Sequence, residues 1–203
     1  MNLKVCGLKY PENIKQVAEL KPDYMGFIFY PESKRFVGEG FVMPVISPNI
    51  KKVGVFVNAS ASYIIDKIDE YKLDLIQLHG DEKPDFCEVF NHLIPVIKAF
   101  GLDESFDLKK LESYKECCTY FLFDTKTKEY GGSGKQFDWT LLEGYDNSTP
   151  FFLSGGIGLE EIDELQIEKL KIGRLEIHCI DVNSKFETIT GIKDIKKLEK
   201  IKF

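Results

Sequence analysis

The sequence predicts an α/β fold, a single (β/α)8 TIM barrel that covers residues 1–203 and has some shortened helices. Short apolar runs alternate with longer amphipathic segments along the chain, which is typical of parallel strands joined by helical crossovers. Eight such runs occur, and eight repeats close a barrel. An open doubly wound sheet is the competing fold, but no Gly-x-Gly-x-x-Gly follows the first run.

The predicted strands are short apolar runs, each followed within two residues by a polar residue, a glycine or a proline. In chain order they cover residues 3–6, 24–29, 53–57, 75–78, 94–99, 119–123, 151–153 and 175–180.

The segments between these runs carry apolar residues at helical spacing. The first follows Pro11, and the clearest, 61–71, places Ile64, Ile65 and Ile68 on one face. A Lys-rich closing helix with apolar residues every third position, from Ile192 to Ile201, is expected to present a solvated face without a function. Further helices are predicted over 85–91, 108–114, 139–142 and 159–165, and residues 40–47 form at most a short one.

Composition excludes several classes of protein. A net charge of −6 gives a nucleic-acid partner no electrostatic support. The longest aromatic-apolar run, 24–30, is too short to cross a bilayer, and the N-terminus lacks a signal-peptide stretch. Five cysteines without a Cys-x-x-Cys pair fit a reducing compartment, and the three histidines lack metal-ligand spacing. We therefore expect a cytoplasmic protein with no membrane segment, no nucleic-acid partner and no metal.

Reactive side chains fall at the carboxyl ends of the predicted strands, where a barrel of this type has its active site. Cys6 closes the first strand, His79 follows the fourth, Asp124 the sixth and Asp181 the eighth. Arg35 lies in the loop after the second strand. Thiol, imidazole, carboxyl and guanidinium groups are therefore expected at one mouth of the barrel.

Each of these residues has a purely structural alternative. A cysteine on an apolar strand is often a small buried hydrophobe, and we give this role to the other four, Cys87, Cys117, Cys118 and Cys179. Asp124 is a candidate helix cap, although the glycine-bearing loop 125–136 follows it and not a helix. His79 and Arg35 are alternatively ordinary solvated side chains.

Two glycine-bearing segments have the positions of binding loops. Gly155 and Gly156 directly follow the seventh strand, and Ser184 follows the eighth. Loops at these places often bind phosphate through backbone N–H groups, although a plain tight turn is the alternative. The loop 130–134 lacks the Gly-Lys-Ser/Thr ending of a P-loop, so we expect a lid or a substrate-contacting loop there.

Along nearly the whole chain, these segments resemble the phosphoribosylanthranilate isomerase family. No single motif is decisive, but their order and their placement at strand ends are specific. The matching segments are 4–7, 26–29, 31–35, 53–58, 77–82, 123–124, 131–134, 137–139, 154–157, 181–184 and 191–194. Three positions depart from the family pattern: Lys185 stands where a small residue is usual, Thr190 where proline is common, and Ser133 where threonine is usual.

The resemblance implies an Amadori rearrangement in tryptophan biosynthesis, with no cofactor and a small phosphorylated substrate. By the family pattern, Asp124 is the general acid that opens the ribose ring and Cys6 the general base that removes the C2 proton. Arg35 matches the position that holds the anthranilate carboxylate, and His79 and Asp181 match positions near the substrate. The resemblance leaves the protein either a monomer or a homodimer.

This chemistry makes opposite demands on the acid and the base. A thiol base needs electropositive surroundings, whereas a carboxylic acid must keep its proton. Lys4 shares a strand face with Cys6 by the two-residue alternation, so we expect Lys4 inside the barrel, where its charge favours the thiolate.

Two alternative functions differ in the residues they require. Another phosphate-binding barrel enzyme, such as a pentulose-phosphate epimerase or indole-glycerol-phosphate synthase, would be expected to carry metal-binding His and Asp residues or a catalytic lysine at a strand end. A catalytically silent sugar-phosphate-binding barrel would be expected to lose the acid or the base. Cys6 and Asp124 are both present, which favours the isomerase.

Overall fold

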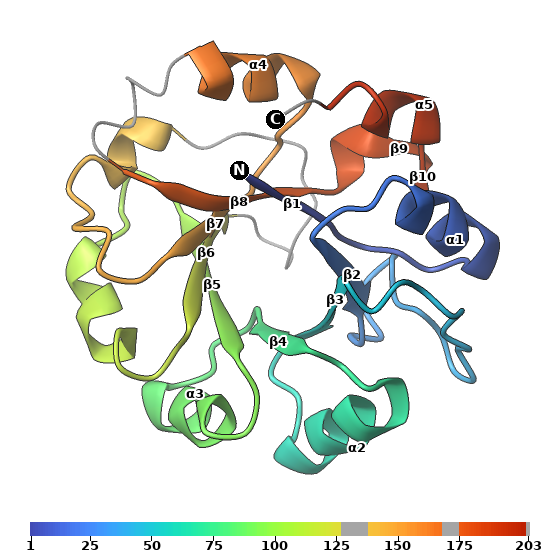
Figure 1. Ribbon diagram of the computed structural model, residues 1–203. Helices are drawn as coiled ribbons and strands as arrows, with labels where there is room; N and C mark the ends of the chain where they lie inside the picture. The colour runs from blue at the N-terminus through green and yellow to red at the C-terminus, as the bar shows by residue number, and fades with distance from the viewer. Residues whose placement is uncertain (127–137, 168–174, 202–203) are drawn as a thin grey trace.

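Eight parallel strands close into a barrel in the computed structural model, which describes residues 1–126, 138–167 and 175–201 (Figure 1). The strands are hydrogen-bonded in sequence order, and β1 also pairs with β8. They are β1 (Asn2–Val5), β2 (Tyr24–Ile28), β3 (Lys51–Phe56), β4 (Leu75–Leu78), β5 (Val96–Leu102), β6 (Tyr120–Thr125), β7 (Phe151–Leu153) and β8 (Ile177–Val182). The predicted fold is confirmed, and every predicted strand is present within a few residues of its expected bounds.

Helices surround the barrel, and local sequence explains where several of them begin (Figure 1). Proline occupies the first turn of α1 and of α3, where its missing N–H costs nothing. The Ser60 hydroxyl caps α2 by accepting a hydrogen bond from the Tyr63 N–H. The α-helices are α1 (Pro11–Glu19), α2 (Ala61–Tyr71), α3 (Pro84–Asn91), α4 (Leu159–Ile167) and α5 (Ile195–Leu198), and the 3₁₀ helices are η1 (Leu108–Tyr114), η2 (Trp139–Leu142) and η3 (Ser184–Phe186).

The predicted helices differ from the structure in type and length. Those at 108–114 and 139–142 are 3₁₀ helices, and residues 40–47, where at most a short helix was expected, form none. The closing helix was predicted too long, because Ile192 belongs to a hairpin of β9 (Glu187–Ile189) and β10 (Ile192–Lys193) and only Ile195–Leu198 is α-helical. Gly191, at a φ of +87°, makes the hairpin turn. The expected lid, 130–134, lies outside the described residues.

The barrel interior is filled in layers by side chains that alternate along each strand. The amino-terminal layer is apolar and contains Tyr24, Val53, Leu75, Ile97, Leu122, Phe152 and Cys179. One step further along the strands, Lys4, Gln77 and Asp181 form a buried polar layer. The next interior positions are Cys6, His79 and Asn183, which line a pocket. The polar layer is therefore the floor of that pocket.

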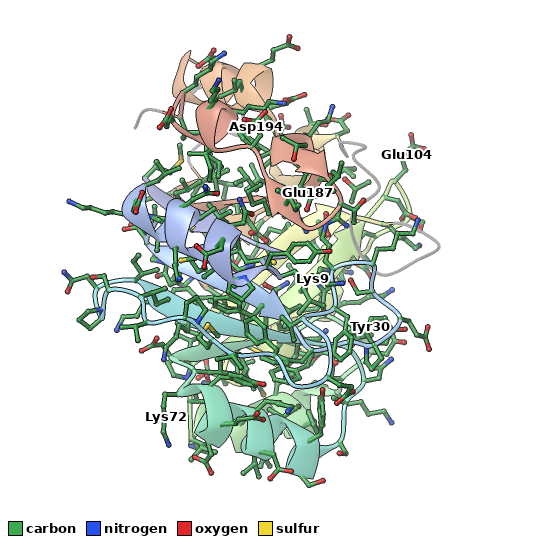
Figure 2. All side chains as sticks on the ribbon, turned by 90° about the vertical axis from the view of Figure 1, so that its right-hand side faces the viewer. Lys9, Tyr30, Lys72, Glu104, Glu187 and Asp194 are labelled. Carbon is green, nitrogen blue, oxygen red and sulfur yellow. The ribbon has the colours of Figure 1, made fainter. Side chains whose placement is uncertain are left out.

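The two ends of the barrel differ in what they expose. Figure 2 places Tyr30 and Glu104, which follow β2 and β5, toward one end and Lys72, which precedes β4, toward the other. The pocket opens at the first of these ends, where the strands terminate. Within the described ranges, no helix has the length and apolar character needed to span a membrane. The same residues contain no cluster of three or more His, Cys, Asp or Glu side chains suited to a metal ion.

Candidate active site

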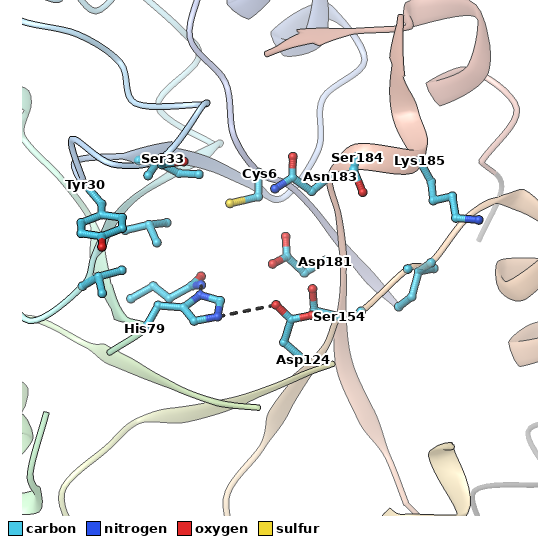
Figure 3. A pocket seen from close by; sticks show the side chains of 17 residues that line it. Cys6, Tyr30, Ser33, His79, Asp124, Ser154, Asp181, Asn183, Ser184 and Lys185 are labelled. Carbon is cyan, nitrogen blue, oxygen red and sulfur yellow. Dashed lines mark hydrogen bonds and ion pairs between the residues drawn. The ribbon is translucent and has the colours of Figure 1, made fainter. Parts of the chain in front are cut away.

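The pocket at the carboxyl ends of the strands brings together seven of the eight residues predicted for the site (Figure 3). Cys6 enters from β1, and Asp181 lies between it and the pair formed by His79 and Asp124 (Figure 3). The predicted residues that line the pocket are Cys6, His79, Asp124, Gly155, Gly156, Asp181 and Ser184. Arg35 is the exception and does not line it.

Cys6 directly follows β1 and is only 4% exposed. Its backbone N–H donates to the Val182 carbonyl of β8, which fixes the thiol at the strand end. Gly26 of β2 lies against it, since a Cβ at that glycine would be 2.7 Å from the Cys6 Sγ. The pocket wall is therefore shaped to leave room for the sulfur atom.

Burial raises the pKa of the Cys6 thiol, while Lys4 acts to lower it, Asp181 adds to the rise and Lys193 opposes it. The cations expected around the thiol are present, but burial outweighs them. Burial thus favours the neutral thiol, and the surrounding cations do not by themselves supply the partial thiolate that the chemistry was expected to require.

Asp124 lies near the end of β6, with its carboxyl group in the pocket. Its Oδ1 accepts a hydrogen bond from the Thr125 N–H at 2.8 Å, and its Oδ2 is 3.5 Å from the His79 Nε2. Gly155, at a φ of +91°, allows loop and strand to approach, because a Cβ there would lie 2.5 Å from the Thr125 Oγ1 and 3.3 Å from the Asp124 Oδ1. Glycine at this position is thus required by the geometry around the carboxyl group.

The buried layer below the pocket is held by Lys4, which lies inside the barrel as predicted. The Lys4 Nζ donates to the Asp181 Oδ2 at 2.9 Å and to the Gln77 Oε1 at 2.8 Å. Burial alone would lower the pKa of Lys4, but Asp181 and Cys6 raise it, so the lysine stays charged. For Asp181, burial disfavours the charged form and therefore raises the pKa, and Lys4 is the main influence against that rise.

Arg35 lies beside the pocket and is engaged by an acidic residue that sequence reasoning missed. Its Nε and Nη2 donate to Glu187 at 2.8 and 2.7 Å, a bidentate ion pair. Glu187 also accepts from the Lys193 Nζ at 2.8 Å, and although burial favours its neutral form, Arg35 and Lys193 lower its pKa. The Arg35 guanidinium also interacts electrostatically with Cys6.

The loops after β7 and β8 form the wall of the pocket that was predicted to bind phosphate. Gly155 and Gly156 both have positive φ, +91° and +67°, a conformation in which successive N–H groups can point to one side. Ser184 begins η3, and Lys185 also lines the pocket. The lysine that departs from the family pattern thus places a cation beside the glycine loop.

Sequence reasoning did not single out Gln77, Ser154 or Asn183, which also line the pocket. For Gln77 a signal was available, because it is two residues before His79 on the same face of a strand. Nothing in the sequence indicated that its partner is Lys4, which is 73 positions away.

Comparisons with known proteins agree with this geometry. The sequence pattern of the family described as N-(5'-phosphoribosyl)anthranilate isomerase matches residues 3–202. An N-(5'-phosphoribosyl)anthranilate isomerase of Parabacteroides distasonis is 44% identical, with 98% of this chain and 90% of the relative covered. The crystal structure of phosphoribosyl anthranilate isomerase from Thermotoga maritima aligns with a TM-score of 0.82 at 33% identity, over 98% of this chain and 95% of the other.

A further solved structure is informative about ligands. It is a phosphoribosyl anthranilate isomerase in complex with reduced 1-(o-carboxyphenylamino)-1-deoxyribulose 5-phosphate. It aligns with a TM-score of 0.80 at 29% identity, over 98% of this chain and 95% of that one.

Proposed function

The chain belongs to the N-(5'-phosphoribosyl)anthranilate isomerase family, and we propose that Cys6 is the general base and Asp124 the general acid of its reaction. It is an isomerase of tryptophan biosynthesis. The reaction converts N-(5-phosphoribosyl)anthranilate into 1-(2-carboxyphenylamino)-1-deoxyribulose 5-phosphate. The observation that carries the assignment of roles is that Cys6 and Asp124 line one pocket from different strands, β1 and β6.

The proposed steps use the two groups in turn. Asp124 donates a proton to the ribose ring oxygen, the C1–O bond opens, and the substrate nitrogen supplies the electron pair for a protonated Schiff base. Cys6 as thiolate then removes the C2 proton, and the C2–H electrons form an enolamine that tautomerises to the aminoketose. Asp181 lies between acid and base, and its Oδ1 has no hydrogen-bond partner in the described part of the chain, so we assign it a substrate hydroxyl.

Two anionic ends of the substrate need positive partners. Glu187 takes the Nε and Nη2 of Arg35, and we place the anthranilate carboxylate on the remaining Nη1. The phosphate is assigned to the backbone N–H groups of Gly155, Gly156 and Ser184, with Lys185 adding its charge. His79 supports the acid through its contact with Asp124.

Other properties follow from the assignment as proposals. We propose that residues 1–203 form one catalytic domain that works in the cytoplasm as a monomer or a homodimer. It has no nucleic-acid partner, which its net charge of −6 supports. Sedimentation at several protein concentrations, with a salt-dependent nucleic-acid binding assay beside it, tests both statements.

The experiment that tests the function is turnover of phosphoribosylanthranilate, followed by loss of anthranilate-type fluorescence. Cys6→Ser and Asp124→Asn are each expected to lower kcat by about 10²-fold or more, the usual contribution of general acid–base groups. Cys117→Ser and Asp66→Asn, which change residues away from the pocket, are the matched controls. An inactive wild type that binds a reduced product analogue would identify a silent sugar-phosphate-binding barrel instead.

A further inference from the structure

We propose that Gln77 is a positioning residue for the acid, because it holds His79 in the tautomer whose hydrogen is on Nε2, facing Asp124. This inference rests on the proposed role of Asp124. Gln77 itself is 1% exposed and belongs to the buried layer below the pocket. It connects the lysine of that layer with the histidine of the site.

The orientation of the Gln77 amide follows from the chemistry of Lys4. An ammonium group has only donors, so it must face the amide oxygen, and the Lys4 Nζ is 2.8 Å from the Gln77 Oε1. The amide NH₂ is then directed at the His79 Nδ1, 2.8 Å away. That NH₂ can only donate, so the Nδ1 must present its lone pair and the ring hydrogen is on Nε2.

Lys4 cannot turn away from the amide to allow the opposite arrangement. Its Nζ is also held by the Asp181 Oδ2 at 2.9 Å, and the lysine side chain is fully buried. A flipped Gln77 would place its NH₂ against the ammonium group and leave buried donors without acceptors. The buried charge therefore sets the amide, and the amide sets the ring.

The tautomer decides what the imidazole does to the acid. With its hydrogen on Nε2, the ring can only donate toward the Asp124 Oδ2, 3.5 Å away, and has no lone pair there that could take a proton from the carboxyl group. With its hydrogen on Nδ1, the Nε2 lone pair would face Asp124 and accept that proton. The result would be an imidazolium–carboxylate pair with no proton for the ribose oxygen. Gln77 thus prevents the imidazole from acting as a competing base toward the group that must donate a proton.

Several charged groups surround His79 and contribute to the electrostatic environment of its ring. Asp124 faces it from β6, Asp181 interacts with it from β8, and Lys4 of β1 is connected to it through Gln77. Lys98 and Glu82 form a buried ion pair at 3.2 Å that holds the backbone of the residue after His79. The Lys98 Nζ donates to the Gly80 carbonyl, and the Gly80 N–H donates to Glu82.

The test is Gln77→Glu, which keeps the acceptor for Lys4 but replaces the NH₂ donor by an oxygen that accepts from Nδ1–H. Nitrogen-15 spectra of the ring are expected to show a pyridine-type Nδ1 and a protonated Nε2 in the wild type. In the variant, Nδ1 gains a hydrogen and kcat falls by roughly 10²-fold, the usual share of a general acid, with a much smaller change in KM. Gln16→Glu on the exposed side of α1 adds the same charge and is expected to change neither result.

The outcomes separate this inference from the function it rests on. A wild-type ring with its hydrogen on Nδ1, or with both nitrogens protonated at neutral pH, overturns the tautomer. A variant that moves the hydrogen to Nδ1 and keeps full kcat overturns the positioning role. A wild type with the expected tautomer but no turnover overturns the proposed function and the catalytic part of the inference together. His79→Asn assigns the signals, and Gln77→Met, which loses both bonds, replaces Gln77→Glu if that variant fails to fold.

Discussion

Replacing Lys4 by methionine removes the cation from the barrel interior and leaves the Asp181 carboxylate buried without a counter-ion. The two charged atoms are 2.9 Å apart, and their side chains are 0% and 5% exposed. Removing one partner of such a buried pair costs about 3–5 kcal/mol of folding free energy. For a chain of this size, each kcal/mol lowers Tm by about 2–4 °C, so we expect a decrease of roughly 6–20 °C near neutral pH.

The cost depends on pH with a definite sign. Burial already raises the pKa of Asp181 in the wild type, and loss of Lys4, the main opposing influence, raises it further. A carboxyl group whose pKa is higher in the folded than in the unfolded state lowers stability when it is charged, above its folded pKa. That penalty decreases as the pH falls through the folded pKa. Lys4→Met should therefore lose more stability at pH 8 than at about pH 5, relative to the wild type at each pH.

Urea unfolding followed by circular dichroism measures this directly. Lys15→Met is the matched control, because its partner Glu12 is 2.8 Å away but the two side chains are 53% and 83% exposed. That exposed pair should contribute about 0–1 kcal/mol. Asp181→Asn and the double variant complete a cycle whose coupling should exceed about 1 kcal/mol. A loss below about 1 kcal/mol for Lys4→Met, equal at both pH values, would refute the buried pair.

Three further predictions concern the site. Because burial raises the pKa of Cys6, the thiolate should form only above the ordinary thiol range, and an ultraviolet difference spectrum between the wild type and Cys6→Ser that shows thiolate below a pH of about 7 would contradict this reasoning. Gly26→Ala should cost about 1–3 kcal/mol in urea unfolding and lower kcat, since its Cβ would lie 2.7 Å from the Cys6 Sγ, and an unchanged enzyme would show that this wall is loose. Arg35→Lys loses the bidentate pair with Glu187 and should raise KM by about tenfold or more in steady-state kinetics, whereas an unchanged KM would remove the anthranilate carboxylate from Arg35.

The barrel could be predicted because each strand carries its own signal in the sequence. The run 75–78 has identical bounds in prediction and structure, since a short apolar stretch between polar residues fits only a buried strand there. The closing segment shows the limit of this approach. Ile192, Ile195 and Leu198 have helical spacing, but Lys193 is buried in a hairpin strand and its backbone N–H donates to the Asn13 Oδ1, which is 180 positions away.

The same division applies to the site. Cys6, His79, Asp124 and Asp181 could be assigned because the carboxyl end of a parallel strand is a position that the sequence defines. The pairing of Arg35 with Glu187 could not, because it joins the loop after β2 to β9, 152 positions away. The raised pKa of Cys6 also depends on burial, which spacing along one strand does not report.

Lys4 links the two halves of the proposed chemistry, and this makes them separable by experiment. Its charge lowers the pKa of the Cys6 thiol on one side, and its bond to the Gln77 oxygen orients the amide that contacts His79 on the other. Lys4→Met should therefore disturb both the base and the acid, whereas Gln77→Met keeps the charge of the lysine and disturbs the amide contact with His79. If the pH dependence of kcat/KM on its alkaline side shifts in the first variant and not in the second, the shared lysine is the physical connection between them. Equal shifts in both would mean that any change in the buried layer displaces the thiol.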